Sequence, residues 1–136
     1  MIVDDDVDLL ALYDFMEVSN DVLIVVREGG LSALKSLYDL NYDVDAVLMD
    51  LSMPDIDGIR LTQQIRDNER LRSKHHPIKI FWMTGWPYDE NDPLDPVVQA
   101  SEESDVTEIF TKPVSPVVTI GEIKRILTEG VDNSEA

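Results

Sequence analysis

One stretch decides the fold: Val47-Leu48-Met49-Asp50-Leu51-Ser52-Met53-Pro54-Asp55-Ile56-Asp57-Gly58, in which a single carboxylate follows an apolar run. An apolar run without polar alternation is typical of a strand that is covered on both faces of a sheet. The proline and the glycine that follow predict a turn. We therefore expect Asp50 at the end of a buried strand, where its side chain faces a cleft lined by loops.

Short apolar runs recur along the chain and predict a sheet of five strands. The expected strands are Ile2–Val3, Val22–Val26, Ala46–Met49, Ile78–Met83 and Glu108–Thr111. Each run is nearly continuous in aliphatic residues, as in parallel sheets with helices on both faces. The alternation of such runs with amphipathic stretches predicts an α/β fold, a doubly wound five-stranded parallel sheet.

Apolar residues at helical spacing predict the helices between these strands. The expected core stripes are Leu9, Leu12, Tyr13 and Met16, then Leu34, Leu37 and Leu40, then Leu61 and Ile65, and finally Ile120, Ile123 and Leu127. Three prolines interrupt the region from Trp86 to Asp105, where we expect a long loop and a short helix over Val97–Glu103.

Length and composition fit one domain over residues 1–131, followed by a polar tail over residues 132–136. Cysteine is absent, which excludes disulfides and thiolate metal sites. No segment approaches the roughly 20 apolar residues that span a bilayer, so we expect no membrane contact and a cytoplasmic protein. The net charge of -17 disfavours direct binding to nucleic acids, whose phosphates it repels.

Polar residues occupy the ends of four predicted strands. They are Asp4-Asp5-Asp6 after the first strand, Asp50 after the third, Thr84-Gly85 after the fourth and Lys112-Pro113 after the fifth. Ligands of a doubly wound sheet bind at this edge, where the carboxyl ends of the strands meet. Converging carboxylates repel one another unless a cation lies among them, and oxygen ligands suit Mg²⁺.

A carboxylate such as Asp50 can act as a nucleophile towards phosphorus and form an acyl phosphate. Phosphoryl transfer depends on positioning and on stabilising the charge of the phosphoryl oxygens. Lys112 can supply an ammonium for this purpose, and Thr84 or its neighbouring backbone can supply a hydrogen-bond donor. The strand ends therefore predict phosphoryl chemistry at Asp50.

Taken together, these residues resemble the receiver domain of two-component response regulators, which has the CheY-like, flavodoxin-like fold. The resemblance rests on Asp4-Asp5, Asp50 with Met53-Pro54 and Asp57-Gly58, Thr84, and Lys112-Pro113, in this order along nearly the whole chain. It implies the strand order 2-1-3-4-5. It also implies a signalling switch, rather than a metabolic enzyme, that accepts a phosphoryl group from a sensor histidine kinase or a phosphotransfer protein.

The resemblance also implies a metal site. Asp5 would bind Mg²⁺ directly, Asp4 would act through water or help to hold the ion, and Asp50 and the backbone carbonyl of Ser52 would complete the protein ligands. Mn²⁺ is an alternative ion. Asp6 then lies at the start of the first helix, where a carboxylate is favourable as a cap.

Further roles follow from the same resemblance. Lys112 would pair with the phosphoryl oxygens, and Thr84 would move to hydrogen-bond the phosphate. The Lys112-Pro113 bond is a candidate for the cis form. The switch would act on a downstream protein that the sequence does not name, through the surface of the fourth helix, fifth strand and fifth helix, and a phosphorylation-dependent homodimer stays open.

Two positions depart from the family pattern. Many members carry an aromatic residue three positions before the lysine, where this chain has Ile109, and we expect the neighbouring Phe110 to pack in the core instead. Trp86 lies two positions after Thr84, where residues influence the lifetime of the phosphoryl group. Its indole either restricts the attacking water, which predicts a long-lived phosphoryl state, or simply packs on the loop.

Two other functions fit the residues less well. A hydrolase of small phosphate esters would need a second carboxylate two residues after the nucleophile, and Ser52 occupies that position. A purely structural receiver-like domain would lack one of the acidic residues or the lysine, and all of them are present. The switch is therefore the preferred prediction.

Overall fold

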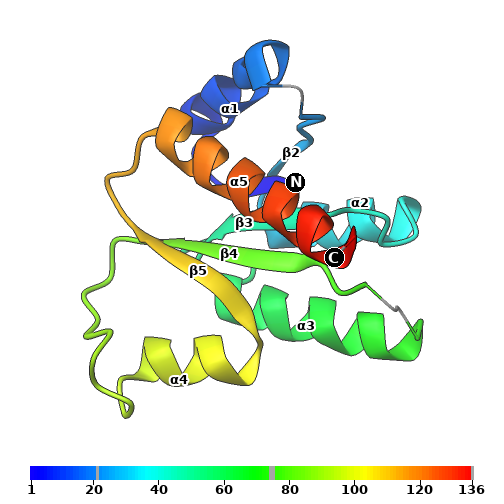
Figure 1. Cartoon of the computed structure of the whole chain (residues 1–136). Helices are drawn as coiled ribbons and strands as arrows, with labels where there is room; N and C mark the ends of the chain where they lie inside the picture. Colours follow the sequence, from blue (N-terminus) through cyan, green and yellow to red (C-terminus); the bar gives the residue numbers. More distant parts are fainter. Residues whose placement is uncertain (21, 74–75, 136) are drawn as a thin grey trace.

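The computed structural model describes residues 1–20, 22–73 and 76–135, in which five strands alternate with five helices (Figure 1). The strands are β1 (Ile2–Asp4), β2 (Val26–Glu28), β3 (Ala46–Asp50), β4 (Lys79–Thr84) and β5 (Val106–Thr111). The helices are α1 (Val7–Asn20), α2 (Gly30–Asp39), α3 (Gly58–Leu71), α4 (Pro96–Glu103) and α5 (Pro116–Glu135). No helix in these ranges is long and apolar enough to cross a bilayer.

The strands form one parallel sheet in the order β2-β1-β3-β4-β5, which confirms the predicted fold class and topology. The chain reverses its winding direction between β1 and β3. In the register of this sheet Val3 pairs with Met49, and Asp50 pairs with Met83. The carboxyl ends of β1, β3 and β4 therefore meet at one edge, beside the switch point where such folds bind ligands.

Two apolar clusters cover the two faces of the sheet, with α1 and α5 on one side and α3 and α4 on the other (Figure 1). Neighbouring residues of β3 and β4 point to opposite faces, as the period of a strand requires. Met49 and Trp82 belong to the cluster under α2 and α3, whereas Leu48 and Phe81 belong to the cluster under α1 and α5. This double coverage explains the unbroken apolar runs of these strands.

The second strand lies elsewhere than predicted. The apolar run suggested Val22–Val26, but β2 is Val26–Glu28, because Ile2 pairs with Val26 and Asp4 pairs with Glu28. β2 is an edge strand and only partly buried, so it accommodates Arg27 and Glu28, while Leu23 of the apolar run is exposed. Hydrophobicity alone therefore predicted the wrong residues for β2, because pairing with β1 determines which residues form this strand.

The other strands and the fourth helix are close to their predicted positions, with ends shifted by one or two residues. In α1 the predicted core residue Leu12 is 57% exposed, whereas Leu10, which was not predicted, is buried with Tyr13. Leu10 and Tyr13 are three residues apart and share a helix face, from which Leu12 is turned away. Leu40, predicted for the second stripe, follows the end of α2 and is also exposed.

The last helix extends further towards the carboxyl terminus than the polar sequence of residues 132–136 suggests. Helix α5 runs to Glu135, so residues 132–135 of the expected tail continue the helix, and Ala136 lies outside the described residues. The boundary between a domain over residues 1–131 and a tail stays a prediction. The long loop after β4 and the short α4 are confirmed.

Candidate functional site

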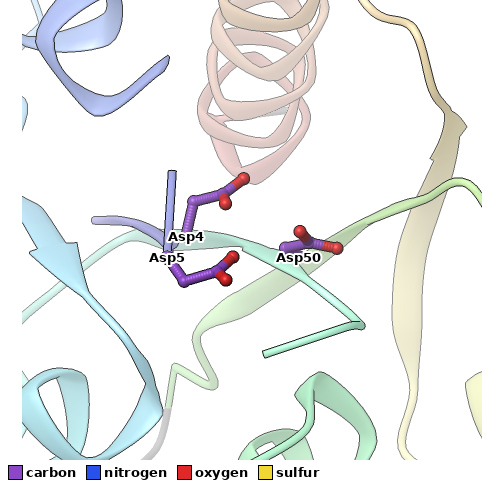
Figure 2. Close-up of side chains that lie close together, drawn as sticks. All are labelled: Asp4, Asp5 and Asp50. Carbon is purple, nitrogen blue, oxygen red and sulfur yellow. The ribbon is translucent and has the colours of Figure 1, made fainter. Parts of the chain in front are cut away.

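Three carboxylates converge at the carboxyl edge of the sheet. Asp4 ends β1, Asp5 follows it, and Asp50 ends β3. One oxygen of each lies within 4.8 Å of the others, and Figure 2 shows the three side chains facing a common space. Asp4 and Asp50 are buried, while Asp5 is exposed. The structure thus brings together the three acidic side chains that the sequence predicted to hold a cation.

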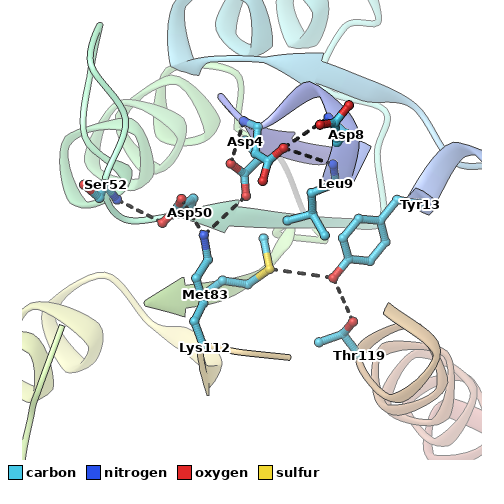
Figure 3. Close-up of polar contacts among 10 residues, drawn as sticks. Asp4, Asp8, Leu9, Tyr13, Asp50, Ser52, Met83, Lys112 and Thr119 are labelled. Carbon is cyan, nitrogen blue, oxygen red and sulfur yellow. Dashed lines mark hydrogen bonds and ion pairs between the residues drawn. The ribbon is translucent and has the colours of Figure 1, made fainter. Parts of the chain in front are cut away.

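Lys112 supplies the nearest positive charge. Its Nζ donates a hydrogen bond to Asp50 Oδ2 at 2.7 Å and lies 3.6 Å from Asp4 Oδ2 (Figure 3). The lysine follows β5 directly, and its backbone N–H donates to the Thr84 carbonyl at 2.8 Å. The Lys112-Pro113 peptide bond is cis, as predicted. The backbone of Lys112 is therefore held by β4.

The charge of Lys112 is stabilised by its neighbours. Burial lowers the pKa of this ammonium, but the hydrogen bond to Asp50 and the charges of Asp4 and Asp50 outweigh burial, so that the pKa is raised. Lys112 is therefore protonated at neutral pH and available to bind an anion.

Asp4 has an oxygen whose charge is poorly compensated. Its Oδ1 accepts a hydrogen bond from the Asp6 backbone N–H at 3.0 Å, but its buried Oδ2 accepts none from the described residues. Burial is the main cause that raises the pKa of Asp4, with a further contribution from the charge of Asp50. A buried carboxylate oxygen without a donor is costly. This oxygen, together with Asp5 and Asp50, fits a hard divalent cation such as Mg²⁺.

This geometry leads to a prediction for the metal-free protein. An Asp4→Asn variant should be more stable than wild type at pH 7, by about 1–3 kcal/mol, because a neutral amide replaces a buried charge. Chemical denaturation in the presence of a chelator measures this difference. An equal or lower free energy of unfolding would contradict it.

The pH dependence gives a second test of the same variant. The pKa of Asp4 is higher in the folded protein than in the unfolded chain, so the folded protein binds more protons between the two values. The contribution of Asp4 to stability is therefore most favourable at low pH and falls as the pH rises through the folded pKa. The Asn variant should lack this component of the pH dependence.

Asp50 is held by contacts to both of its oxygens. Oδ1 accepts the Ser52 backbone N–H at 3.1 Å, and Oδ2 accepts Lys112 Nζ (Figure 3). Helix α3 starts very close to this strand end: a Cβ added to Gly58 would lie only 2.6 Å from the Asp50 carbonyl oxygen. A glycine is therefore needed at position 58, where the first residue of α3 contacts the end of β3.

Thr84 lies at the same edge of the sheet. It ends β4, one residue beyond the pairing partner of Asp50, and is almost fully buried. Its Oγ1 accepts a hydrogen bond from the Trp86 backbone N–H at 2.9 Å. The hydroxyl group is therefore linked to the first residues of the loop that leads to α4.

Ile109 and its neighbour Phe110 occupy opposite faces of β5. Ile109 packs against the cluster that contains Trp82, whereas Phe110 packs under α1 and α5, with its ring stacked on Phe81 at 6.3 Å between centroids. Phe110 thus packs against the core as predicted, although its side chain is only partly buried. Trp86 is 39% exposed, so its indole is partly available to solvent.

Asp6 is a helix cap, as predicted. Its Oδ1 accepts the backbone N–H groups of Asp8 at 3.1 Å and Leu9 at 3.2 Å, in the first turn of α1. The acidic triplet is thereby divided: Asp4 and Asp5 belong to the carboxylate cluster, and Asp6 stabilises the helix that follows.

Two tertiary contacts near the site were not predicted. The buried Tyr13 hydroxyl shares a hydrogen bond with Thr119 Oγ1 at 2.9 Å and lies 3.7 Å from Met83 Sδ, next to Thr84 (Figure 3). Asp55, in the loop after β3, hydrogen-bonds the first turn of α2. In the sequence only the Gly29-Gly30 pair hints at the contact between Asp55 and α2. Its meaning becomes clear only from the structure, in which the loop after β3 packs against this pair.

Residues 1–124 match the response regulator receiver domain, and the chain belongs to this family. Protein RcaC of Microchaete diplosiphon is 23% identical over 133 residues, which are 98% of this chain and 18% of RcaC. The chain thus spans less than a fifth of that relative.

Solved structures show the same fold. A CheY-like receiver domain from Methanospirillum hungatei JF-1 has a TM-score of 0.74 at 23% identity, covering 97% of this chain and 94% of that one. The receiver domain of Ssk1 from Saccharomyces cerevisiae, crystallised with the histidine phosphotransfer protein Ypd1, has a TM-score of 0.71 at 22% identity, covering 94% and 84%. The family match identifies the chain as a receiver domain of two-component systems, a class consistent with a phosphoacceptor switch.

Proposed function

We propose that this receiver domain accepts a phosphoryl group on Asp50 from a phosphohistidine of a sensor histidine kinase or phosphotransfer protein. The observation that carries the proposal is that the Asp50 carboxylate lies 2.7 Å from the Lys112 ammonium and within 4.8 Å of two further carboxylates. An oxygen of Asp50 attacks phosphorus and forms a P–O bond. The P–N bond to the donor histidine breaks, and its electron pair leaves with the imidazole, which takes up a proton.

Asp4, Asp5, Asp50 and the backbone carbonyl of Ser52 would hold Mg²⁺, with Mn²⁺ as an alternative. A bound divalent ion supplies positive charge for the phosphoryl oxygens. The buried Oδ2 of Asp4 accepts no hydrogen bond from the described residues and lies 3.6 Å from Lys112 Nζ, which supports this assignment, since a cation would compensate its buried charge.

Lys112 and Thr84 would respond to the new dianion. The ammonium of Lys112 now pairs with Asp50, and it would pair with a phosphoryl oxygen attached to that carboxylate. Thr84 now accepts from the Trp86 N–H, and its hydroxyl would donate to another phosphoryl oxygen. Movement of Thr84 would pull on the loop before α4 and change the α4–β5–α5 surface. A few kcal/mol between two states are enough for such a switch.

The function is that of a self-phosphorylating and self-dephosphorylating switch, not of an enzyme that turns over a metabolite. Ser52 stands where a phosphate-ester hydrolase would carry its general acid, which argues against that alternative. The crystal structure of the Ssk1 receiver domain with the histidine phosphotransfer protein Ypd1 supports a phosphotransfer protein as a partner of this fold. The downstream protein, a phosphorylation-dependent homodimer and a cytoplasmic location stay predictions.

The direct test is incubation of the protein with Mg²⁺ and acetyl phosphate. Intact mass spectrometry should show the gain of one phosphoryl group, and borohydride reduction followed by peptide mapping should place it on Asp50. Omission of Mg²⁺ is the control and should prevent labelling. A protein that takes no label, or that is labelled elsewhere, would overturn the proposed function.

The lifetime of the phosphoryl group tests the role of Trp86. If the indole restricts the attacking water, a Trp86→Ala variant should lose its phosphoryl group about fivefold faster, which corresponds to ~1 kcal/mol of activation free energy. The decay of the labelled mass after removal of acetyl phosphate measures this rate. Tyr88→Ala, in the same loop, is the matched control, and an unchanged rate in the Trp86 variant would count against the hypothesis.

A further inference from the structure

Asp55 connects the loop that follows the phosphoacceptor to a distant helix. Its Oδ1 accepts the backbone N–H of Gly30 at 3.2 Å, and its Oδ2 accepts that of Leu31 at 3.0 Å. Both donors lie in the first turn of α2, whose own N-cap residue, Gly29, has no side chain to serve them. A helix leaves its first N–H groups without internal partners. Asp55 therefore caps α2 from a segment 24 residues further along the chain.

The glycine pair before α2 makes room for this loop. Gly29 has a φ of 92°, and a Cβ there would lie 2.8 Å from Asp55 Oδ2. A Cβ on Gly30 would lie 2.0 Å from Ile56 Cγ2, which is a collision. The Gly29-Gly30 pair is thus required for close contact between the turn before α2 and the loop after β3.

The same turn also contacts the end of β1. The Gly29 backbone N–H donates to the Asp4 carbonyl oxygen at 3.3 Å. The turn before α2 is therefore linked to both strands that carry the carboxylate cluster. It contacts Asp4 directly, and through Asp55 it contacts the loop that carries Ser52. The Ser52 N–H in turn donates to Asp50. This chain of contacts ties the loop after β3 to the end of β1.

We propose that Asp55 is a positioning residue for the metal site. It holds the loop that carries Ser52, so that the carbonyl oxygen of Ser52 can bind the same cation as the carboxylates of Asp4, Asp5 and Asp50. The inference rests on the proposed function. Met53 anchors the same loop in the core, and Asp55 supplies a second, polar anchor three residues beyond Ser52. Without it, the loop would have to be ordered by the cation itself, at a cost in affinity.

The test is a titration of the metal-free protein with MgCl₂ by calorimetry. An Asp55→Ala variant should bind Mg²⁺ on the order of tenfold more weakly than wild type. Its rate of phosphorylation should fall at low Mg²⁺ and return to within about twofold of wild type at saturating Mg²⁺, since Asp55 touches none of the reacting atoms.

Asp55→Asn should give an intermediate affinity. Its Oδ1 can still accept from Gly30 and from the Ile56 N–H, but its amide nitrogen would face the Leu31 N–H, where two donors oppose each other. Gly30→Ala offers an independent variant that leaves Asp55 intact. Alanine is a better helix former than glycine, so weaker Mg²⁺ binding in that variant would arise from the collision with Ile56.

Asp95→Ala is the matched control. Asp95 is the half-exposed N-cap residue of α4 and, like Asp55, its carboxylate accepts helix N–H groups, those of Val97 at 2.9 Å and Val98 at 3.3 Å. Both alanine variants should lower the denaturation midpoint, and only Asp55→Ala should weaken Mg²⁺ binding. Equal Mg²⁺ affinities of wild type and Asp55→Ala would overturn this inference and leave the proposed function intact. A wild-type protein that binds no Mg²⁺ and takes no phosphoryl group would overturn both.

Discussion

An Asp50→Asn variant is expected to take up no phosphoryl group from acetyl phosphate or from a phosphorylated donor protein, while it stays folded. The amide is neutral and lacks the nucleophilic oxygen of the carboxylate. The fold should tolerate the change, because the amide oxygen can still accept the Ser52 N–H in place of Asp50 Oδ1. Intact mass spectrometry measures the label, and circular dichroism measures the fold.

The same variant should bind Mg²⁺ at least about tenfold more weakly, because the cluster loses one of its three carboxylates. The matched control is Asp45→Asn, which makes the same charge change in an exposed residue just before β3, at the other end of that strand. This control should be labelled like wild type. Labelling of Asp50→Asn at the wild-type rate would show that the acceptor lies elsewhere.

A Lys112→Met variant is expected to be phosphorylated about 10²–10³-fold more slowly at saturating Mg²⁺. Lys112 is the ammonium beside the acceptor, and removal of one preorganised donor to a developing negative charge has an effect of this order. Methionine keeps the length and the apolar part of the side chain, so the loss reports the charge. Single-turnover labelling by mass spectrometry measures the rate.

Loss of Lys112 should also destabilise the metal-free protein, because the buried carboxylates of Asp4 and Asp50 would lose the ammonium group that pairs with them. Lys112 itself is about a third exposed, so we expect about 1–3 kcal/mol rather than the larger cost of breaking a fully buried pair. Mg²⁺ should restore most of the difference. Lys79→Met, at the amino end of β4, is the matched control and should change neither quantity strongly.

The sequence predicted the residues at the strand ends well, because a buried parallel strand is read from its apolar run alone. Asp50 and Thr84 each end such a run, and Lys112 follows one, so the common edge of the sheet brings them together without further information. The prediction failed for β2, an edge strand that contains the polar residues Arg27 and Glu28. There the run Val22–Val26 was chosen for its hydrophobicity, while pairing with β1 selected Val26–Glu28.

By itself, then, the sequence determined the class of fold, the order of the strands through the family resemblance, and the acidic residues, lysine and threonine that meet at the candidate site. These are properties of local patterns and of the direction in which parallel strands end. Only the tertiary structure decided that Oδ2 of Asp4 accepts no hydrogen bond from the described residues and that Asp55 caps α2. Such contacts join segments far apart in the chain, and their geometry depends on packing that no local pattern records.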